Sequence, residues 1–266
     1  MSMQKRFSPE AEEILENIRN TAAKGQMECI PNLLIVSDTG AGFSEYSRRI
    51  EEILNQYKAF SMRGEKTYFE VTFPPIEASE RDFRKFMQSG NAVALFQNEY
   101  SGVEVISFEE YLGKDIFGPR FDILLNYIDK AKERTFFIFK VNQAFKAKNE
   151  LFGRLNNHIN LLQLSLEQPG SYEAVNYIIT RLKEQGFEFT FKAREALEEV
   201  ILSRLEHSKE TYRGYHTLNL LSQSIAYELI TSGFINNKKI TINAVRQISN
   251  KVFTPFITKK NRPIGF

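Results

Sequence analysis

Apolar residues recur in short runs along the first half of the chain, and helical patterns separate these runs. The runs are partly β-branched and are bounded by turn residues, which is typical of buried strands. They occupy residues 33–36, 67–73, 103–108 and 135–139. A further apolar run at 92–96 stands close enough to 103–108 for the two to form a hairpin.

Apolar residues at helical spacing predict helices between these strands. Ser8 and Pro9 are suited to begin the first helix as N-cap and first helical residue, and Gly25 is suited to end it. Further helices are predicted around residues 50–57, 79–87 and 123–128. Strands that alternate with helices predict an α/β fold, in which a parallel sheet carries helices on both faces.

The pattern becomes all-helical after about residue 170. Three helical patterns there follow a hydroxyl residue that is suited to an N-cap, namely Ser171, Thr190 and Thr241. A long apolar pattern covers residues 217–231. We therefore predict two domains, an α/β domain over residues 1–168 and a small all-helical domain over residues 169–266.

Composition narrows the classes of protein. Hydrophobic residues make up 42% of the 266 residues and charged residues 26%, as in an ordinary globular protein. The 35 basic and 33 acidic residues leave a net charge of +2, which gives no bulk attraction to nucleic acid. The single cysteine, Cys29, excludes an internal disulfide. No apolar run approaches the length of a membrane span, and the N-terminus lacks a signal-peptide core, so we expect a cytoplasmic protein.

Residues 37–44, which we call the glycine loop, stand between the first predicted strand and a helix. In a phosphate-binding loop of the form G-x-x-x-x-G-K-[ST], backbone N–H groups surround the phosphates, a lysine reaches the outer phosphates, and a hydroxyl holds Mg²⁺. The glycine loop supplies Gly42 and Ser44, with an additional Gly40. Ser37 replaces the first glycine and Phe43 replaces the lysine. From the spacing alone, a tight strand-to-helix turn is the favoured explanation of the glycines.

Residues 31–44 resemble the Walker A segment of AAA+ ATPases, and are most similar to the branch that contains red-type rubisco activase and stage V sporulation protein K. Other stretches resemble that family in the same order along nearly the whole chain. Residues 105–111 are similar to its Walker B strand, and residues 136–141 with Asn142 to its sensor 1 strand. Arg154 lies in the region of its trans-acting arginine, and residues 217–220 resemble the lid helix around sensor 2. The resemblance implies an αβα sandwich followed by a helical lid.

The resemblance also implies a site for ATP with Mg²⁺, at which the loss of the phosphate lysine would leave binding weak or absent. Its cofactor-binding residues would be Asp38, Thr39, Gly40, Ala41, Gly42, Phe43, Ser44, Glu109 and Asn142. Ser44 and Glu109 would contact the metal, while Glu110 and Arg154 would be catalytic. Asn98 and Glu99 are the alternative Walker B pair. A solvated strand end explains either pair equally well, and a surface position is the simpler interpretation of Arg154.

The departures from the family fall on catalytic positions. Phe43 removes the phosphate lysine, Glu109 replaces the metal-binding aspartate, and Leu218 stands in place of the sensor 2 arginine. Phosphoryl transfer depends on positioned positive charge, so the loss of two cations worth roughly 3 kcal/mol each lowers the rate on the order of 10⁴-fold.

We therefore expect a non-hydrolysing structural or regulatory module that contacts other AAA+ subunits, or a neighbouring AAA+ domain within a longer protein. A weak ATPase that remodels a protein substrate is the alternative. A clamp-loader-like subunit that associates with DNA is a third hypothesis, which the near-neutral charge disfavours.

Overall fold

A computed structural model of the chain describes residues 7–59, 68–73, 81, 84–85, 102–108, 118–207, 212–231 and 239–246. By their contacts these residues fall into two compact units. The sheet unit contains residues 7–38 and 42–167 as far as they are described. The helical unit contains Thr39–Ala41 and the described residues from Gln168 onward.

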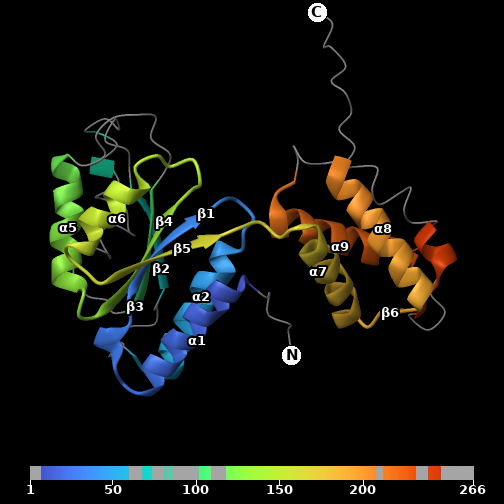
Figure 1. The fold of residues 1–266 in the computed structure, drawn as a ribbon, viewed down its shortest axis with the longest axis horizontal. Coiled ribbons are helices and arrows are strands. Elements are labelled where there is room, and N and C mark those ends of the chain that lie inside the picture. Colours follow the sequence, from blue (N-terminus) through green and yellow to red (C-terminus); the bar gives the residue numbers. More distant parts are fainter. Residues whose placement is uncertain are drawn as a thin grey trace, which may run out of the picture. The chain divides into compact units, whose positions relative to one another are not determined.

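The sheet unit is built on five strands that all pair in parallel. They are β1 (Asn32–Ser37), β2 (Tyr68–Phe73), β3 (Gly102–Phe108), β4 (Thr135–Val141) and β5 (Leu161–Leu166). Their order across the sheet is β2-β3-β4-β1-β5 (Figure 1). This confirms the predicted parallel α/β fold, since the strands predicted at 33–36, 67–73, 103–108 and 135–139 correspond to β1, β2, β3 and β4 as far as these residues are described.

Helices cover both faces of this sheet (Figure 1). One face carries α1 (Pro9–Ala23) and α2 (Phe43–Gln56), and the other carries α5 (Pro119–Ala131) and α6 (Lys148–Asn156). A 3₁₀ turn, η1 (Met27–Cys29), joins α1 to β1. Ser8 caps α1 as predicted, because its hydroxyl oxygen accepts a hydrogen bond from the Ala11 N–H at 3.3 Å.

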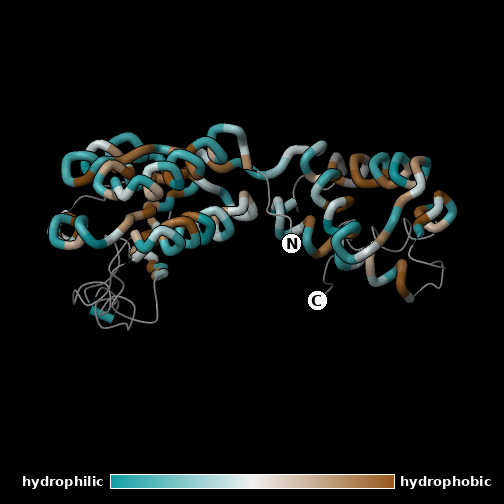
Figure 2. The backbone as a smooth tube through the Cα atoms, turned by 90° about the horizontal axis from the view of Figure 1, so that it is seen from below, coloured by the Kyte–Doolittle hydropathy of each residue, from teal (hydrophilic) through white to brown (hydrophobic). Residues whose placement is uncertain are grey.

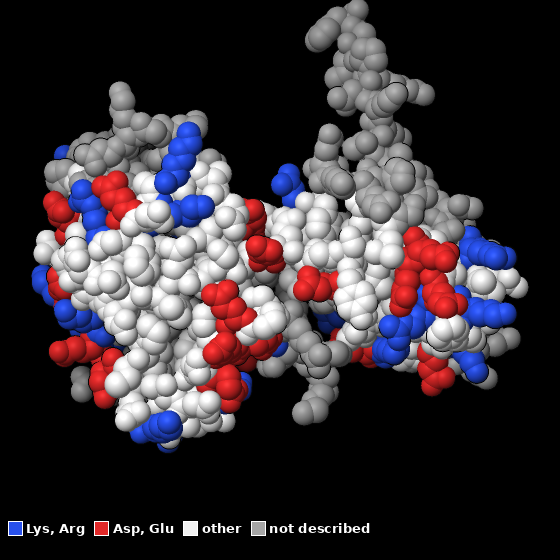
Figure 3. Space-filling view, in the orientation of Figure 1, with Lys and Arg blue, Asp and Glu red and all other residues white. Residues whose placement is uncertain are grey.

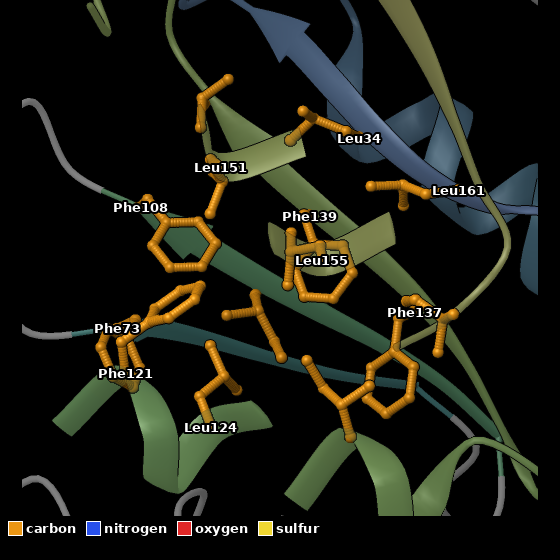
Figure 4. Close-up of a cluster of buried hydrophobic side chains, with 14 of the residues drawn as sticks. Leu34, Phe73, Phe108, Phe121, Leu124, Phe137, Phe139, Leu151, Leu155 and Leu161 are labelled. Atoms are coloured by element: carbon orange, nitrogen blue, oxygen red, sulfur yellow. The ribbon is translucent and has the colours of Figure 1, made fainter. Parts of the chain in front are cut away.

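Alternate residues of the strands form an aromatic core against α5 and α6 (Figure 4). The Phe108 ring lies 6.3 Å from the Phe121 ring of α5, and the Phe137 and Phe139 rings are stacked at 5.9 Å. The intervening residues face α1 and α2, as expected from the two-residue period of a strand.

Two expectations about the strands were incomplete or wrong. The hairpin of 92–96 with 103–108 is not formed as predicted, because both edges of β3 pair in parallel, with β2 and with β4. Residues 92–96 themselves lie outside the described residues. The sequence pattern also missed β5, whose polar Gln163 and Ser165 interrupt its apolar run. β5 lies at the edge of the sheet, where no strand follows it. Its side chains are therefore less covered by neighbours, and polar residues are tolerated there.

The helical unit contains α7 (Ser171–Glu184), α8 (Phe191–His207), α9 (Gly214–Thr231) and a short helix at 242–246. Polar and apolar residues alternate along these helices (Figure 2), and their apolar residues form a second core. Thr190 and Thr241 accept the expected capping bonds from Ala193 N–H (3.3 Å) and Ala244 N–H (3.4 Å).

Two details of the helical unit go beyond the sequence prediction. The N-cap of α7 is Gly170 rather than Ser171, and the Glu173 carboxylate accepts the Gly170 N–H at 2.8 Å. The unit also contains a short parallel pair of strands, β6 (Glu188–Phe189) and β7 (Lys239–Ile240), which are too short to leave an apolar pattern. Among the described residues, no helix is both long and apolar enough to span a membrane.

Candidate functional site

The sheet unit has a topological switch point between β1 and β4. These strands are neighbours, but the chain leaves β1 through α2 on one face of the sheet and leaves β4 through α6 on the other. In open α/β sheets, ligands bind outside the carboxyl ends of the strands at such a point. The glycine loop follows β1, and Asn142 follows β4, so the predicted loop lies where this topology favours a ligand.

The backbone of the glycine loop has the left-handed geometry that only glycine adopts freely. Gly40 has φ +87° and Gly42 has φ +89°. Gly42 is the N-cap of α2, and no side chain caps that helix end. The first N–H groups of α2 therefore point out of the helix without a side-chain acceptor from the cap, an arrangement suited to an anion.

Phe43 is the first residue of α2 and is only 5% exposed. The position of the phosphate lysine is thus occupied by a packed aromatic side chain. The Nζ of Lys140, from β4, lies 4.5 Å from the centre of the Phe43 ring. A positive charge is consequently present at the start of α2, although it comes from another strand.

Polar groups link the two loops at the switch point. An Asp38 carboxylate oxygen accepts the Gln143 N–H at 3.0 Å and so ties the glycine loop to the segment after β4. The Oδ1 atom of Asn142 is buried and has no hydrogen bond within the described part of the chain. A buried acceptor without a partner is costly, which makes Asn142 a position suited to contact a ligand donor or water.

The metal ligands expected from the sequence are only partly described. Ser44 is exposed on the first turn of α2, as a hydroxyl that reaches a bound cation must be. Glu109 and Glu110 lie outside the described residues, as do Asn98 and Glu99. In the portions that are described, no group of three or more His, Cys, Asp or Glu side chains is arranged to hold a metal ion. The loop therefore fits phosphate groups, while Ser44 alone of the described residues fits the Mg²⁺ role.

Thr39–Ala41 pack with the helical unit. The Gln168 side-chain amide donates to the Thr39 carbonyl at 2.7 Å, and the Tyr215 N–H donates to the Gly40 carbonyl at 2.9 Å. A Cβ atom on Gly40 would lie 2.0 Å from the carbonyl oxygen of Arg213. Position 40 therefore needs a glycine for two reasons, its positive φ and the close approach of the Arg213 backbone. The tight-turn interpretation accounts for the first reason only.

Two further positions that the resemblance singled out have surroundings of their own. Arg154, on α6, has a side chain 42% exposed and forms an ion pair with Glu150 at 3.4 Å. Leu218 is fully buried in the core of the helical unit. Its position is therefore a packing position, and a functional arginine could not be placed there without burying its charge.

The sequence pattern did not single out Lys140, whose Nζ the structure places over the Phe43 ring. It stands in the run Phe139–Val141 of a strongly apolar strand, where a lone lysine reads as an exposed strand end. Only the strand register places it beside the glycine loop, because Lys140 pairs with Ile35 of β1.

Comparisons with known proteins give the fold a name. No protein-family model matches the chain. No curated protein matches it either. Among solved structures, the RuvB Holliday junction branch migration motor of Thermotoga maritima aligns with a TM-score of 0.56 over 92% of this chain and 69% of its own, at 14% identity. Two variants of that motor align with TM-scores of 0.55, over 91% and 92% of this chain and 69% of theirs, at 13% and 14% identity.

RuvB is an AAA+ ATPase. The chain has an AAA+ fold. This confirms the fold that the order of motifs implied. Because the sequence identity to RuvB is 14%, the comparison supports the AAA+ fold and no statement about activity.

Proposed function

We propose that the chain is an AAA+-like module that does not hydrolyse ATP and acts as a structural or regulatory part of an assembly with other AAA+ subunits or domains. One observation carries this proposal: the packed side chain of Phe43 occupies the position of the phosphate lysine. Phosphoryl transfer is catalysed mainly by charges positioned on the phosphates. In this proposal residues 1–168 form the nucleotide-type domain and residues 169–266 form the lid.

The other site residues keep their proposed roles within this module. Glycine-loop N–H groups and Asn142 would contact the phosphates of ATP, and Ser44 with Glu109 would hold Mg²⁺. Glu110 would orient water in any residual hydrolysis. Arg154 is supported as a contact to a neighbouring subunit by its place on α6, where its side chain is 42% exposed.

The likeness to the rubisco activase and stage V sporulation protein K branch rests on the sequence motifs and stays part of this proposal. So does a cytoplasmic location, which a single cysteine favours. We do not extend the Holliday-junction activity of RuvB to this chain. Its net charge is +2, and acidic and basic side chains are interspersed on the face shown in Figure 3. DNA binding that weakens steeply with salt would contradict this part of the proposal.

A weak ATP-hydrolysing module that remodels a protein is the second candidate. The observation in its favour is the Lys140 ammonium over the Phe43 ring, which returns a cation to the start of α2. The two candidates differ in turnover, since nucleotide binding is weak or absent in the first and is required in the second.

Phosphate release from Mg·ATP by the purified chain separates them. We expect a rate equal to that of buffer, and the same rate for Glu110→Gln. A measurable rate that Glu110→Gln abolishes would overturn the non-hydrolysing proposal in favour of the second candidate. A rate that neither Glu110→Gln nor Glu99→Gln lowers comes from a contaminating enzyme and supports the non-hydrolysing proposal.

A further inference from the structure

We propose that Lys140 provides the positive charge that the glycine loop lacks, so that the loop binds the phosphate groups of a nucleoside triphosphate with a lysine supplied by β4. The inference deepens the proposed function and rests on it only in treating residues 37–44 as a nucleotide-type loop. It begins from one contact, in which the Lys140 Nζ lies 4.5 Å from the centre of the Phe43 ring.

The strand register explains why a residue of β4 reaches the start of α2. Lys140 is the penultimate residue of β4 and pairs with Ile35 of β1 and Ser107 of β3. Its neighbours Phe139 and Val141 belong to the core against α5 and α6. Because successive strand residues face opposite sides of a sheet, Lys140 faces the side that α2 covers. It therefore lies near the carboxyl end of β4, at the switch point with β1.

The Phe43 ring holds the ammonium in this position. A cation over an aromatic face is attracted by the ring, and the attraction is stronger where water is partly excluded. Lys140 is half-buried, and Phe43 is 5% exposed. In the described residues no carboxylate forms an ion pair with Lys140. Within the described residues, its charge is thus positioned by an uncharged aromatic ring.

The surrounding groups complete a site for phosphate. The N-terminus of α2, with Gly42 as its N-cap, offers N–H groups and the positive end of the helix dipole. Asn142 lies two residues beyond Lys140, and its side-chain NH₂ group is of the kind that donates to phosphate oxygens. A lysine is a point charge with three donors, which suits a phosphate tail.

A simple physical argument explains why a phenylalanine stands at the usual lysine position while the lysine comes from β4. A buried Phe43 contributes to the packing of α2 on the sheet, whereas a lysine in the same place would need to leave that packing to reach solvent or ligand. Lys140 can supply the charge from the opposite side of the ring. Phe43 then acts as a platform for the cation, and the substitution in the glycine loop does not by itself remove phosphate affinity.

Titration of the full-length chain with Mg·ATP, followed by calorimetry and by thermal shift, tests the inference. We expect measurable binding by the unmodified chain. Lys140→Ala should weaken the dissociation constant about tenfold or more, because a charge-assisted contact to phosphate is lost. Lys140→Arg should stay within about threefold, since it keeps the charge and can stack on Phe43. Lys130→Ala is the matched control, because it removes an exposed lysine from α5 and should leave the affinity unchanged.

Two results would overturn the inference. One is equal affinity of Lys140→Ala and the unmodified chain, with melting temperatures that show both to be folded. The other is no heat and no thermal shift with millimolar Mg·ATP. Phosphate release measured on the same samples reports the proposed function separately, since turnover would contradict the non-hydrolysing role whether or not Lys140 contributes to binding.

Discussion

Glu104 of the sheet unit carries a carboxyl group that is buried in β3, with only 3% of the residue's surface exposed. The Tyr127 hydroxyl of α5 lies 2.6 Å from both of its carboxylate oxygens. Burial raises the pKa of Glu104 to about 7, against the opposing effects of the Tyr127 hydrogen bond and the nearby Arg134 charge.

This raised pKa predicts that the protein loses stability as pH rises from about 4.5 to about 7. In that range the folded chain retains the Glu104 proton while the unfolded chain has released it, so the free energy of unfolding falls with increasing pH. The contribution is on the order of 3 kcal/mol. Glu104→Gln should remove this part of the slope and should be more stable than the unmodified chain at pH 8, measured by urea unfolding.

The exposed Glu13 of α1 provides the control for that experiment. Glu13→Gln removes the same formal charge from the surface and should leave the pH slope as it is in the unmodified chain. If Glu104→Gln retains the full slope, the carboxyl is not the group that binds the proton.

Gly40 and Gly25 provide a comparison of backbone strain with steric collision. Both have positive φ, +87° and +71°, which costs an alanine on the order of 1 kcal/mol or more. A Cβ on Gly25 would meet nothing within 4 Å, whereas on Gly40 it would lie 2.0 Å from the Arg213 carbonyl oxygen. Gly25→Ala should therefore cost about 1 kcal/mol, and Gly40→Ala at least twice as much, in thermal or urea unfolding. Equal losses would show that the close approach at Gly40 relaxes freely.

At the scale of elements, α9 shows that a sequence position matched to a motif can have another role in the fold. Leu218 was matched to an arginine that contacts nucleotide, yet its side chain is fully buried among the helices of its own unit. Leu220, two residues on, is 46% exposed. Both residues are leucines of the same helix, so they differ only in how deeply their side chains are buried.

Restoring an arginine at Leu218 should therefore destabilise the helical unit rather than create an active site. Leu218→Arg buries an unpaired charge, for which we expect a loss of more than about 4 kcal/mol in the free energy of unfolding and no gain in ATP turnover. Leu220→Arg should change stability by less than about 0.5 kcal/mol. Stable folding of Leu218→Arg, together with stronger nucleotide binding, would contradict the packing role.

The elements that the sequence predicted are those whose local signals agree with their tertiary surroundings. α1 has an N-cap serine and a proline in the first turn, and β4 has an unbroken apolar run, so each pattern identified its element. β5 was missed because its edge position relaxes the requirement for apolar residues. At the candidate site, the glycine loop was visible as spacing along the chain, while Lys140 depends on the register between β1 and β4. Register is a long-range property that a single sequence does not display.

At the scale of the whole molecule, each unit has a hydrophobic core of its own among the described residues, and the two cores have no residue in common. One surrounds Phe139 in the sheet unit, and the other surrounds Ile178 in the helical unit. Each core is fully buried at its centre, since both residues have 0% exposure. A chain with separate cores is expected to open in separate cooperative units, because a cavity in one core removes no contact from the other.

Hydrogen exchange on two cavity variants tests this separation. Phe139→Ala should cost about 3–5 kcal/mol and Ile178→Ala about 2–5 kcal/mol. The first should speed amide exchange mainly in β1, β3 and β4, and the second mainly in α7 and α9. Equal acceleration in all five elements by either variant would show one cooperative unit. In that case a ligand at the glycine loop would stabilise the helical unit as much as the sheet unit, since binding energy raises the stability of everything that unfolds together.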